Sequence, residues 1–592
     1  MRIMEKLELL RQAMASHNMD AYLIVTDDFH GSEYVGDHFK EREFMSGFTG
    51  SAGSLVVLKE EAAIFTDGRY FLQAEEQLKG SGILLMKAGE PGVPTLPRYL
   101  ADKLCENAVI GFDGRTLSYR MAERIREAVW DKNITFSGNE DLVDAIWKER
   151  PALSKEPIRE MTPEFAGKTR TEKMEEIRQE LRESGADFLL LTALDEIAWL
   201  LNLRGHDVEY TPVFLAFMLI EEKEATLFVQ EEVLPEEVRG HLSRDGIAIK
   251  PYDTIYEALS KLSKEQKVWY DSGTANYRIA MSIQNGMDMD SPVILKKAIK
   301  NPAEISHIRE AHIKDGIAVC RFMHWLKETA PKEKLTELVA SESILEFRKE
   351  MDGFLEPSFT SIIAYGAHGA IVHYEPTKES DAVIENHGLC LCDTGGQYVD
   401  GTTDVTRTFV MGELTEEERH AYTLVLKGHI QLARAVFPEG TCGANLDVLA
   451  REPLWREGLD YNHGTGHGVG YLLNVHEGPQ RFHWRVLPGV KQATLEPGMV
   501  SSDEPGLYFA GKFGIRHENL ILVTRTEKNG LLAFEPLTLV PFDRDGLDVS
   551  MLNTEEIEWL NDYHEMVYRT LSPRMSEEER IWLRQYTDKI VP

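Results

Sequence analysis

Two segments in the last third of the chain share one pattern: an apolar run, a polar stretch rich in glycine, and a second apolar run. The first segment spans residues 392–410 and the second spans 501–523. Apolar runs on either side of a glycine-rich turn predict an antiparallel hairpin. Each hairpin should place one carboxylate on each side of its open end, facing the other across the strands. These carboxylates are Asp393 and Asp404 in the first segment and Glu504 and Glu518 in the second.

A glycine-dense segment, HGTGHGVG at 463–470, lies between the two hairpins. Glycine lets a backbone approach other groups closely, so His467 within it can reach a neighbouring site. The segment lacks the lysine of a P-loop and its glycines do not match G-x-G-x-x-G, which argues against phosphate binding. Asp-Gly turns and loop histidines are common one at a time. Only their combination with the carboxylates indicates a shared site.

Four carboxylates brought close together repel one another and cannot all stay ionised without positive charge. Two divalent cations would balance their four negative charges. Four carboxylates and one imidazole favour Mn²⁺, with Co²⁺, Mg²⁺ or Zn²⁺ as alternatives, whereas a lone structural Zn²⁺ prefers Cys and His ligands. Two ions about 3.5–4 Å apart can hold a bridging hydroxide and polarise a carbonyl, which indicates metal-dependent hydrolysis.

Proline-containing charged stretches divide the chain. We expect domains at 1–158, 159–299 and 300–592, the last ending in a charged helical tail from about residue 545. The first two domains repeat one order of helix, strand and strand–turn–strand, which predicts two α/β domains built on the same plan.

The start of the third domain has the signals of a helix N-terminus. Asn301 has the properties of an N-cap, Pro302 suits the first helical position, and Glu304 completes a capping box. We expect this helix to run to about Glu328, with apolar residues at helical spacing on its buried face. Those residues are Ile305, Ile308, Ala311, Ile317 and Phe322.

Composition excludes several classes of partner. The chain has 65 Lys and Arg against 98 Asp and Glu, a net charge of −33, which repels phosphate backbones and anionic membranes. We therefore expect no nucleic-acid and no membrane partner. Its five cysteines form no disulfide framework, and Cys390 and Cys392 in an apolar run are expected in the core. The charged N-terminus is unlike a signal peptide, and no apolar run reaches the roughly 18 residues of a membrane helix, which predicts a cytoplasmic protein.

Together and in this order, the motifs resemble those of the pita-bread metallopeptidases, specifically the Xaa-Pro aminopeptidase (aminopeptidase P) branch. The resemblance covers nearly the whole chain, because earlier segments are similar to the N-terminal and middle domains of the long, three-domain soluble form. It implies an α/β (α+β) architecture of two creatinase-like N-terminal domains followed by a pita-bread catalytic domain. The motifs that carry it are Glu43-FMSGFTGSAG, Phe65-TDGRYFLQA, Ala193-LDEIAWLLNLRG, Asp393-TGGQYVDGTTDVTRT, His463-GTGHGVG, Val475-HEGPQ, Asp503-EPGLY, Phe513-GIRHENL and Trp559-LNDYH.

The resemblance also implies roles for single residues and a homodimer. Glu504 would shuttle a proton, and Arg516 would line the proline side of the pocket. Three histidines in the positions of the family's non-ligand histidines would bind substrate and stabilise the oxyanion, although each has the alternative role of a hydrogen bond to a ligand carboxylate. They are His373, His463 and His476. The ligands of two manganese ions would be Asp393, Asp404, His467, Glu504 and Glu518.

The implied reaction is hydrolysis of the bond between an N-terminal residue and a following proline (Xaa-|-Pro-Yaa) by a metal-bridging hydroxide. An α-amine with a pKa near 7.7–8.0 is partly neutral at pH 7 and can coordinate a metal, which enforces exopeptidase behaviour. The Xaa-Pro bond has no N–H, which excludes peptidases that use that donor. The expected substrates are peptides with proline at the second position.

Two alternatives remain at this point. A prolidase that cleaves Xaa-Pro dipeptides has a similar site but usually a single N-terminal domain. A non-catalytic binding protein on the pita-bread scaffold would lack the metal ligands. Creatinase also lacks them, methionine aminopeptidase would leave about 300 residues unexplained, and neither G-x-S-x-G nor H-E-x-x-H occurs.

Overall fold

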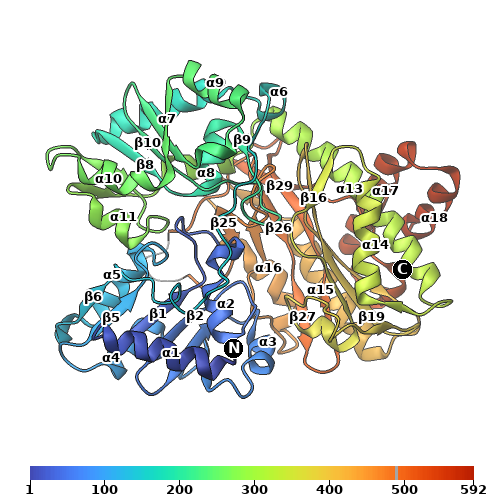
Figure 1. Ribbon diagram of the computed structural model, residues 1–592. Coiled ribbons are helices and arrows are strands. Elements are labelled where there is room, and N and C mark those ends of the chain that lie inside the picture. Colours follow the sequence, from blue (N-terminus) through green and yellow to red (C-terminus); the bar gives the residue numbers. More distant parts are fainter. Residues whose placement is uncertain (487–490, 592) are drawn as a thin grey trace. The chain divides into compact units, whose positions relative to one another are not determined.

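The computed structural model describes residues 1–486 and 491–591, which form two compact units (Figure 1). The first unit comprises Met1–Pro163 and Lys168–Ile294, and the second comprises Glu164–Gly167 and Leu295–Pro592. Both units contain helices and strands, which confirms the predicted α/β class.

The first unit contains two six-stranded sheets. The strands of the first sheet are β1 (Ala21–Val25), β2 (Ser54–Leu58), β3 (Ala62–Thr66), β4 (Ile83–Lys87), β5 (Val109–Phe112) and β6 (Thr135–Ser137). Those of the second are β8 (Phe188–Leu191), β10 (Ala216–Ile220), β11 (Ala225–Val229), β12 (Ile247–Pro251), β13 (Val268–Tyr270) and β14 (Gly286–Asp288). Their orders, β4-β3-β2-β1-β5-β6 and β12-β11-β10-β8-β13-β14, have the same parallel and antiparallel pairings. This match confirms the predicted repetition of one plan.

Alternating side chains of β1 explain why helices cover both faces of the first sheet. Tyr22 and Ile24 belong to the same apolar cluster as residues of α1 (Ile3–Ser16). Ala21 and Leu23 belong to another cluster with residues of α4 (Leu96–Lys103) and α5 (Tyr119–Ala128). Successive strand residues point to opposite faces, so an apolar run without alternation becomes buried on both sides.

The longer segment of the second unit begins at Leu295 within α12 (Pro292–Ala298), and the long helix α13 (Pro302–Thr329) follows. The Asn301 side chain accepts hydrogen bonds from the N–H groups of Ala303 and Glu304, and the Glu304 side chain accepts one from the Asn301 N–H. The predicted start and capping box are therefore confirmed. Of the predicted apolar face, Ile305 is half-buried and the remaining members are buried: Ile308, Ala311, Ile317 and Phe322.

The five predicted metal ligands lie in, or directly next to, strands of two antiparallel sheets of the second unit. The first has the order β17-β19-β22 and consists of β17 (Ile362–Tyr365), β19 (Leu389–Thr394) and β22 (Val405–Val410). The second has the order β23-β30-β29-β26-β24-β25 and consists of β23 (Val436–Pro438), β24 (Gly466–Gly468), β25 (Glu477–Phe482), β26 (Val500–Asp503), β29 (Asn519–Arg525) and β30 (Leu531–Pro536).

One large apolar core supports the first of these sheets. It joins β19 and β22 to α13, α15 (Glu416–Ala433) and α17 (Thr554–Leu571), through residues such as Met323, Phe409 and Leu560. Cys390 and Cys392 are buried in this core, as predicted, and the five cysteines are unpaired. Helices α13, α15 and α17 therefore pack against β19 and β22, the strands that position the first two carboxylates.

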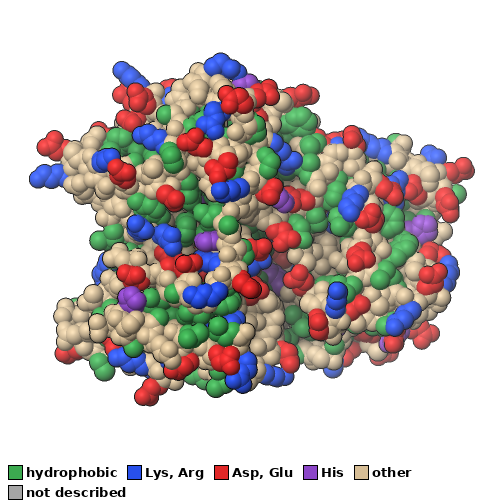
Figure 2. All heavy atoms as spheres, in the orientation of Figure 1, with side chains coloured by type: hydrophobic (Ala, Val, Ile, Leu, Met, Phe, Trp, Pro, Cys, Tyr) green, Lys and Arg blue, Asp and Glu red, His purple; other side chains and the backbone are tan. Residues whose placement is uncertain are grey.

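The predicted helical tail is confirmed as α17 and α18 (Glu577–Thr587). Among residues 1–486 and 491–591, no helix combines the length and apolar character that a membrane span requires. On the face drawn in Figure 2, acidic and basic side chains are interspersed.

Candidate functional site

The four predicted carboxylates lie at the ends of two pairs of antiparallel strands. Asp393 in β19 is opposite Thr406 in β22, and Asp404 immediately precedes β22. In the second pair, Glu504 immediately follows β26 and Glu518 immediately precedes β29. The Glu518 N–H donates to the Thr406 carbonyl oxygen at 3.0 Å, so the two pairs of strands are directly joined.

Neither pair is the simple hairpin that the sequence predicts. The polar stretch of the first pair contains two further strands, β20 (Gly396–Tyr398) and β21 (Gly401–Thr402), and that of the second contains β27 (Gly506–Phe509) and β28 (Phe513–Arg516). Strand pairing and the placement of the carboxylates at the ends agree with the prediction. In each pair, the glycine-rich stretch that interrupts the apolar pattern belongs to an inserted hairpin and not to a single turn.

His467 lies in the short strand β24, between β25 and β26, and not in a loop. A Cβ atom at Gly466 would lie 2.0 Å from the carbonyl oxygen of Ser502, so only glycine allows this approach. The His467 N–H donates to the Ser502 hydroxyl at 2.9 Å, and that hydroxyl donates to Glu504 Oε1 at 3.1 Å. The predicted close approach of the glycine-dense segment is confirmed.

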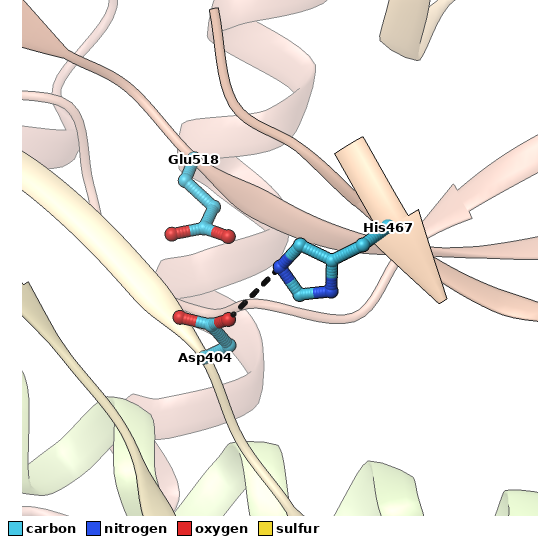
Figure 3. A group of neighbouring side chains, drawn as sticks. All are labelled: Asp404, His467 and Glu518. Atoms are coloured by element: carbon cyan, nitrogen blue, oxygen red, sulfur yellow. Dashed lines mark ion pairs between the residues drawn. The ribbon is translucent and has the colours of Figure 1, made fainter. Parts of the chain in front are cut away.

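Three of the predicted donors converge closely. One ligand atom from each of Asp404, His467 and Glu518 lies within 4.8 Å of the others, and Figure 3 shows their side chains pointing toward one another. His467 Nε2 is 3.6 Å from Asp404 Oδ2 and 3.5 Å from Glu504 Oε1. The Thr406 hydroxyl donates to Glu518 Oε2 at 2.7 Å and fixes that carboxylate.

Asp393 is held by Arg516, which is 1% exposed at its side chain and donates from Nη2 to Asp393 Oδ2. Asp393 Oδ1 is buried and has no hydrogen-bond partner among the described residues. Arg516 Nη1 also donates to the Tyr508 hydroxyl at 2.8 Å, and this hydroxyl lies 2.8 Å from His463 Nε2. A continuous polar chain thus links Asp393 to His463.

Burial sets the electrostatics of the site. It raises the pKa of Glu504 to about 7, with Arg516 opposing and Asp393 adding to this rise. The pKa values of Asp404 and Glu518 are raised well above the ordinary range by burial and by neighbouring carboxylates. Protonation removes the repulsion only by removing the negative charge of a carboxylate. A bound cation offsets the repulsion while the carboxylates stay ionised. The buried Asp393 oxygen without a donor and the oxygen-rich donor set fit hard or borderline divalent ions.

The predicted histidines have different surroundings. The rings of His476 and His467 have centroids 4.2 Å apart and meet edge to face. His463 is 8% exposed and contacts Tyr508, as described. His373 is half-buried and follows the turn 366–370, which approaches β28 so closely that a Cβ atom at Gly514 would lie 1.7 Å from the Gly369 carbonyl oxygen.

Tyr508 is the participant that sequence reasoning missed. Tyr508 is part of the Asp503-EPGLY motif, but the motif alone does not predict that its hydroxyl bridges Arg516 and His463. His517, between Arg516 and Glu518 in the chain, is buried with its ring edge to face against Tyr422 and Phe542, and burial lowers its pKa well below the ordinary value.

Models of known protein families match nearly the whole chain. The model of metallopeptidase family M24 matches residues 306–525, and that of its C-terminal region matches 530–590. Creatinase/prolidase N-terminal domain models match 6–146 and 149–304.

Similar whole-length relatives come from plants, fungi and animals. Aminopeptidase P2 of Arabidopsis thaliana is 41% identical over 96% of this chain and 86% of the relative. A probable Xaa-Pro aminopeptidase P of Laccaria bicolor is 40% identical over 98% of this chain and 92% of the relative. The crystal structure of X-prolyl aminopeptidase from Caenorhabditis elegans, described as a cytosolic enzyme with a di-nuclear active site, superposes with a TM-score of 0.96 at 36% identity and covers 100% of both chains.

Proposed function

Because the chain belongs to the Xaa-Pro aminopeptidase P family, whose catalytic domain is that of metallopeptidase family M24, we propose that it hydrolyses the Xaa-|-Pro-Yaa bond of peptides with proline at the second position. One observation carries the proposal: the donor atoms of Asp404, His467 and Glu518 converge within 4.8 Å of one another. A peptidase that depends on metal needs such a cluster, and a binding protein on the same scaffold does not.

We assign two divalent cations to these residues and to their two carboxylate neighbours. Mn²⁺ suits the donor set best, with Co²⁺, Mg²⁺ and Zn²⁺ as alternatives. When bound, the ions supply an activated water molecule and polarise the scissile carbonyl. The full proposed ligand set is Asp393, Asp404, His467, Glu504 and Glu518.

Glu504 is the proposed proton carrier. Glu504 follows β26 directly and its Oε1 is 3.5 Å from His467 Nε2, so its carboxyl lies at the site, where it can accept a proton from the attacking water and deliver it to the leaving proline nitrogen. Arg516 orients Asp393 by binding one carboxylate oxygen and leaving the other available. We also propose that Arg516 lines the proline side of the pocket.

The three histidines bind and orient the substrate in this proposal. His476 lies against His467, where an imidazole N–H can donate to a developing oxyanion. His463 shares the Tyr508 hydroxyl with Arg516, which places both side chains on one polar chain. We assign His373 to substrate binding as well.

The deciding experiment compares an Xaa-Pro dipeptide with an Xaa-Pro-Yaa tripeptide on Mn²⁺-loaded protein. We expect the tripeptide to be cleaved with the higher kcat/KM and Asp404→Asn to be inactive on both. Cleavage of the dipeptide alone would favour prolidase activity. No bound metal after loading, together with no turnover of either peptide, would favour the binding protein.

We further propose that the chain forms a homodimer and acts in the cytoplasm, as the C. elegans relative is described as cytosolic. The domain division 1–158, 159–299 and 300–592 is likewise proposed. The separate family matches at 6–146, 149–304 and 306–525 support it.

A further inference from the structure

A buried ionic cluster lies beside the candidate site and has none of the roles assigned above. At its centre is Glu477, the first residue of β25, whose carboxylate oxygens lie 2.7 Å from Lys297 Nζ and 2.5 Å from Lys300 Nζ. The side chains are 0%, 3% and 1% exposed for Glu477, Lys297 and Lys300, so these charges are removed from water. The Lys300 N–H donates to the Gly498 carbonyl oxygen at 3.0 Å, which fixes the backbone that carries the lysines.

The backbone of Glu477 adjoins the segments that carry both of the histidines in contact at the site, His467 and His476. Glu477 follows His476 directly in the chain, and its backbone pairs with Gly468, which follows His467. A Cβ atom at Gly468 would lie 2.1 Å from the Glu477 carbonyl oxygen, so the two backbones are pressed together. A shift of Glu477 would therefore change how the His476 ring meets the His467 ring.

Stability alone is a poor reason for such a cluster. Removing a carboxylate and two ammonium groups from water is costly, and a well-packed apolar trio often stabilises a fold as well or better. What the ionic cluster does provide is one defined position for the Glu477 carboxylate, set from two directions by two lysines. Because Glu477 directly follows His476, fixing the Glu477 carboxylate also restrains the backbone next to His476.

We propose that Glu477, held by Lys297 and Lys300, is a positioning residue that keeps the His476 imidazole against His467. The catalytic part of this inference rests on the proposed function, because it assumes that His476 acts on the substrate. The geometric part, that Glu477 keeps the His476 ring against His467, does not depend on the proposed function.

The kinetic test is a double-mutant cycle with Glu477→Gln, His476→Ala and both together, assayed on an Xaa-Pro-Yaa tripeptide. We expect Glu477→Gln to lower kcat roughly 10–100-fold, the range for residues that orient groups of a metal site, with KM within about twofold and metal content unchanged. Added to His476→Ala, it should lower kcat no further, since residues that act through one another are not additive. An equal loss in both backgrounds, an unchanged kcat, or loss of bound metal would overturn the proposal.

The second test measures the geometry without activity. Metal-free wild type and Glu477→Gln are treated with diethyl pyrocarbonate, and the modification rate of His476 is followed by peptide mass spectrometry. We expect several-fold faster modification of His476 in the variant, because its ring is no longer held against His467. Equal rates would overturn the proposal. A faster rate in a protein that cleaves no Xaa-Pro peptide would instead count against the proposed function alone.

Two further variants keep these tests interpretable. Glu556→Gln is a matched control, because Glu556 on α17 is 1% exposed, its carboxylate pairs with Lys427 on α15, and none of the predicted donors lies on either helix. It should lower the melting temperature and leave kcat and His476 modification unchanged. If Glu477→Gln does not fold, Lys297→Met replaces it, with the same expected non-additivity with His476→Ala.

Discussion

Stripping the metal should make the stability of this protein depend on pH through Glu504. Its pKa rises from the ordinary 4.5 to about 7 on folding, chiefly because the carboxyl is buried. A raised pKa means that the contribution to stability is fully present below pH 4.5 and is lost as the pH rises through about 7. Over the interval from pH 5 to pH 8, this linkage amounts to roughly 2–3 kcal/mol of unfolding free energy.

The perturbation that isolates this effect is Glu504→Gln, which resembles the protonated carboxyl at every pH. Chelated wild type and variant are compared by differential scanning calorimetry from pH 5 to pH 8. The two should melt at similar temperatures at pH 5, and the wild type should fall below the variant by roughly 5 °C at pH 8, as expected for roughly 2–3 kcal/mol in a domain of this size. Because neighbouring carboxylates titrate together, the change belongs to the cluster and is assigned to Glu504 only through the variant.

Adding divalent cations provides the matching reversal. Metal binds the ionised carboxylates, so the rise in melting temperature on loading the wild type should grow from pH 5 to pH 8. Parallel melting curves for the two chelated proteins across this range would refute the reasoning, because they would show that burial does not penalise the ionised Glu504.

Further predictions concern catalysis, substrate binding and stability. His476→Ala should lower kcat about 100-fold or more while two metal ions remain bound, as measured by elemental analysis; loss of metal would give this residue a structural role instead. Tyr508→Phe should lower kcat roughly tenfold with little change in KM, because it breaks the link between Arg516 and His463, and unchanged kinetics would show that this link is dispensable. N-acetylated Xaa-Pro peptides should resist cleavage in the same assay, and their rapid hydrolysis would argue against recognition of the free α-amine. Arg407→Met should reduce the free energy of unfolding by about 3 kcal/mol in urea denaturation, because six oxygen atoms lose a donor; an unchanged midpoint would contradict this.

The elements that sequence predicted well are those whose signals are local. The start of α13 follows from Asn301, Pro302 and Glu304, which satisfy the first N–H groups of the helix with side chains three residues apart. The order of helix, strand and strand–turn–strand in the first two domains is also predicted from local apolar runs and the turn residues between them. Such features need no knowledge of the rest of the fold.

What could not be predicted depends on contacts between distant residues. Tyr508 is an ordinary aromatic residue of a strand until Arg516 and His463 are placed on either side of its hydroxyl. Likewise, Lys297 and Glu477 are separated by 180 positions in sequence, and neither is unusual for its local segment. A pattern of glycines also does not distinguish one turn from an inserted hairpin, which explains the incomplete prediction for both carboxylate-bearing segments.

Arg516 and Arg407 stabilise the group of carboxylates in different ways. Arg516 binds the Asp393 side chain directly and so places positive charge among the proposed ligands. Arg407 is also buried, but it donates to the carbonyl oxygens of Thr406 and Glu518 and thus fixes the backbone where the two strand pairs join. Repulsion between carboxylates acts on side chains, whereas Arg407 and the strand ladders restrain the main chain. The site can therefore keep its shape while its net negative charge remains available to cations.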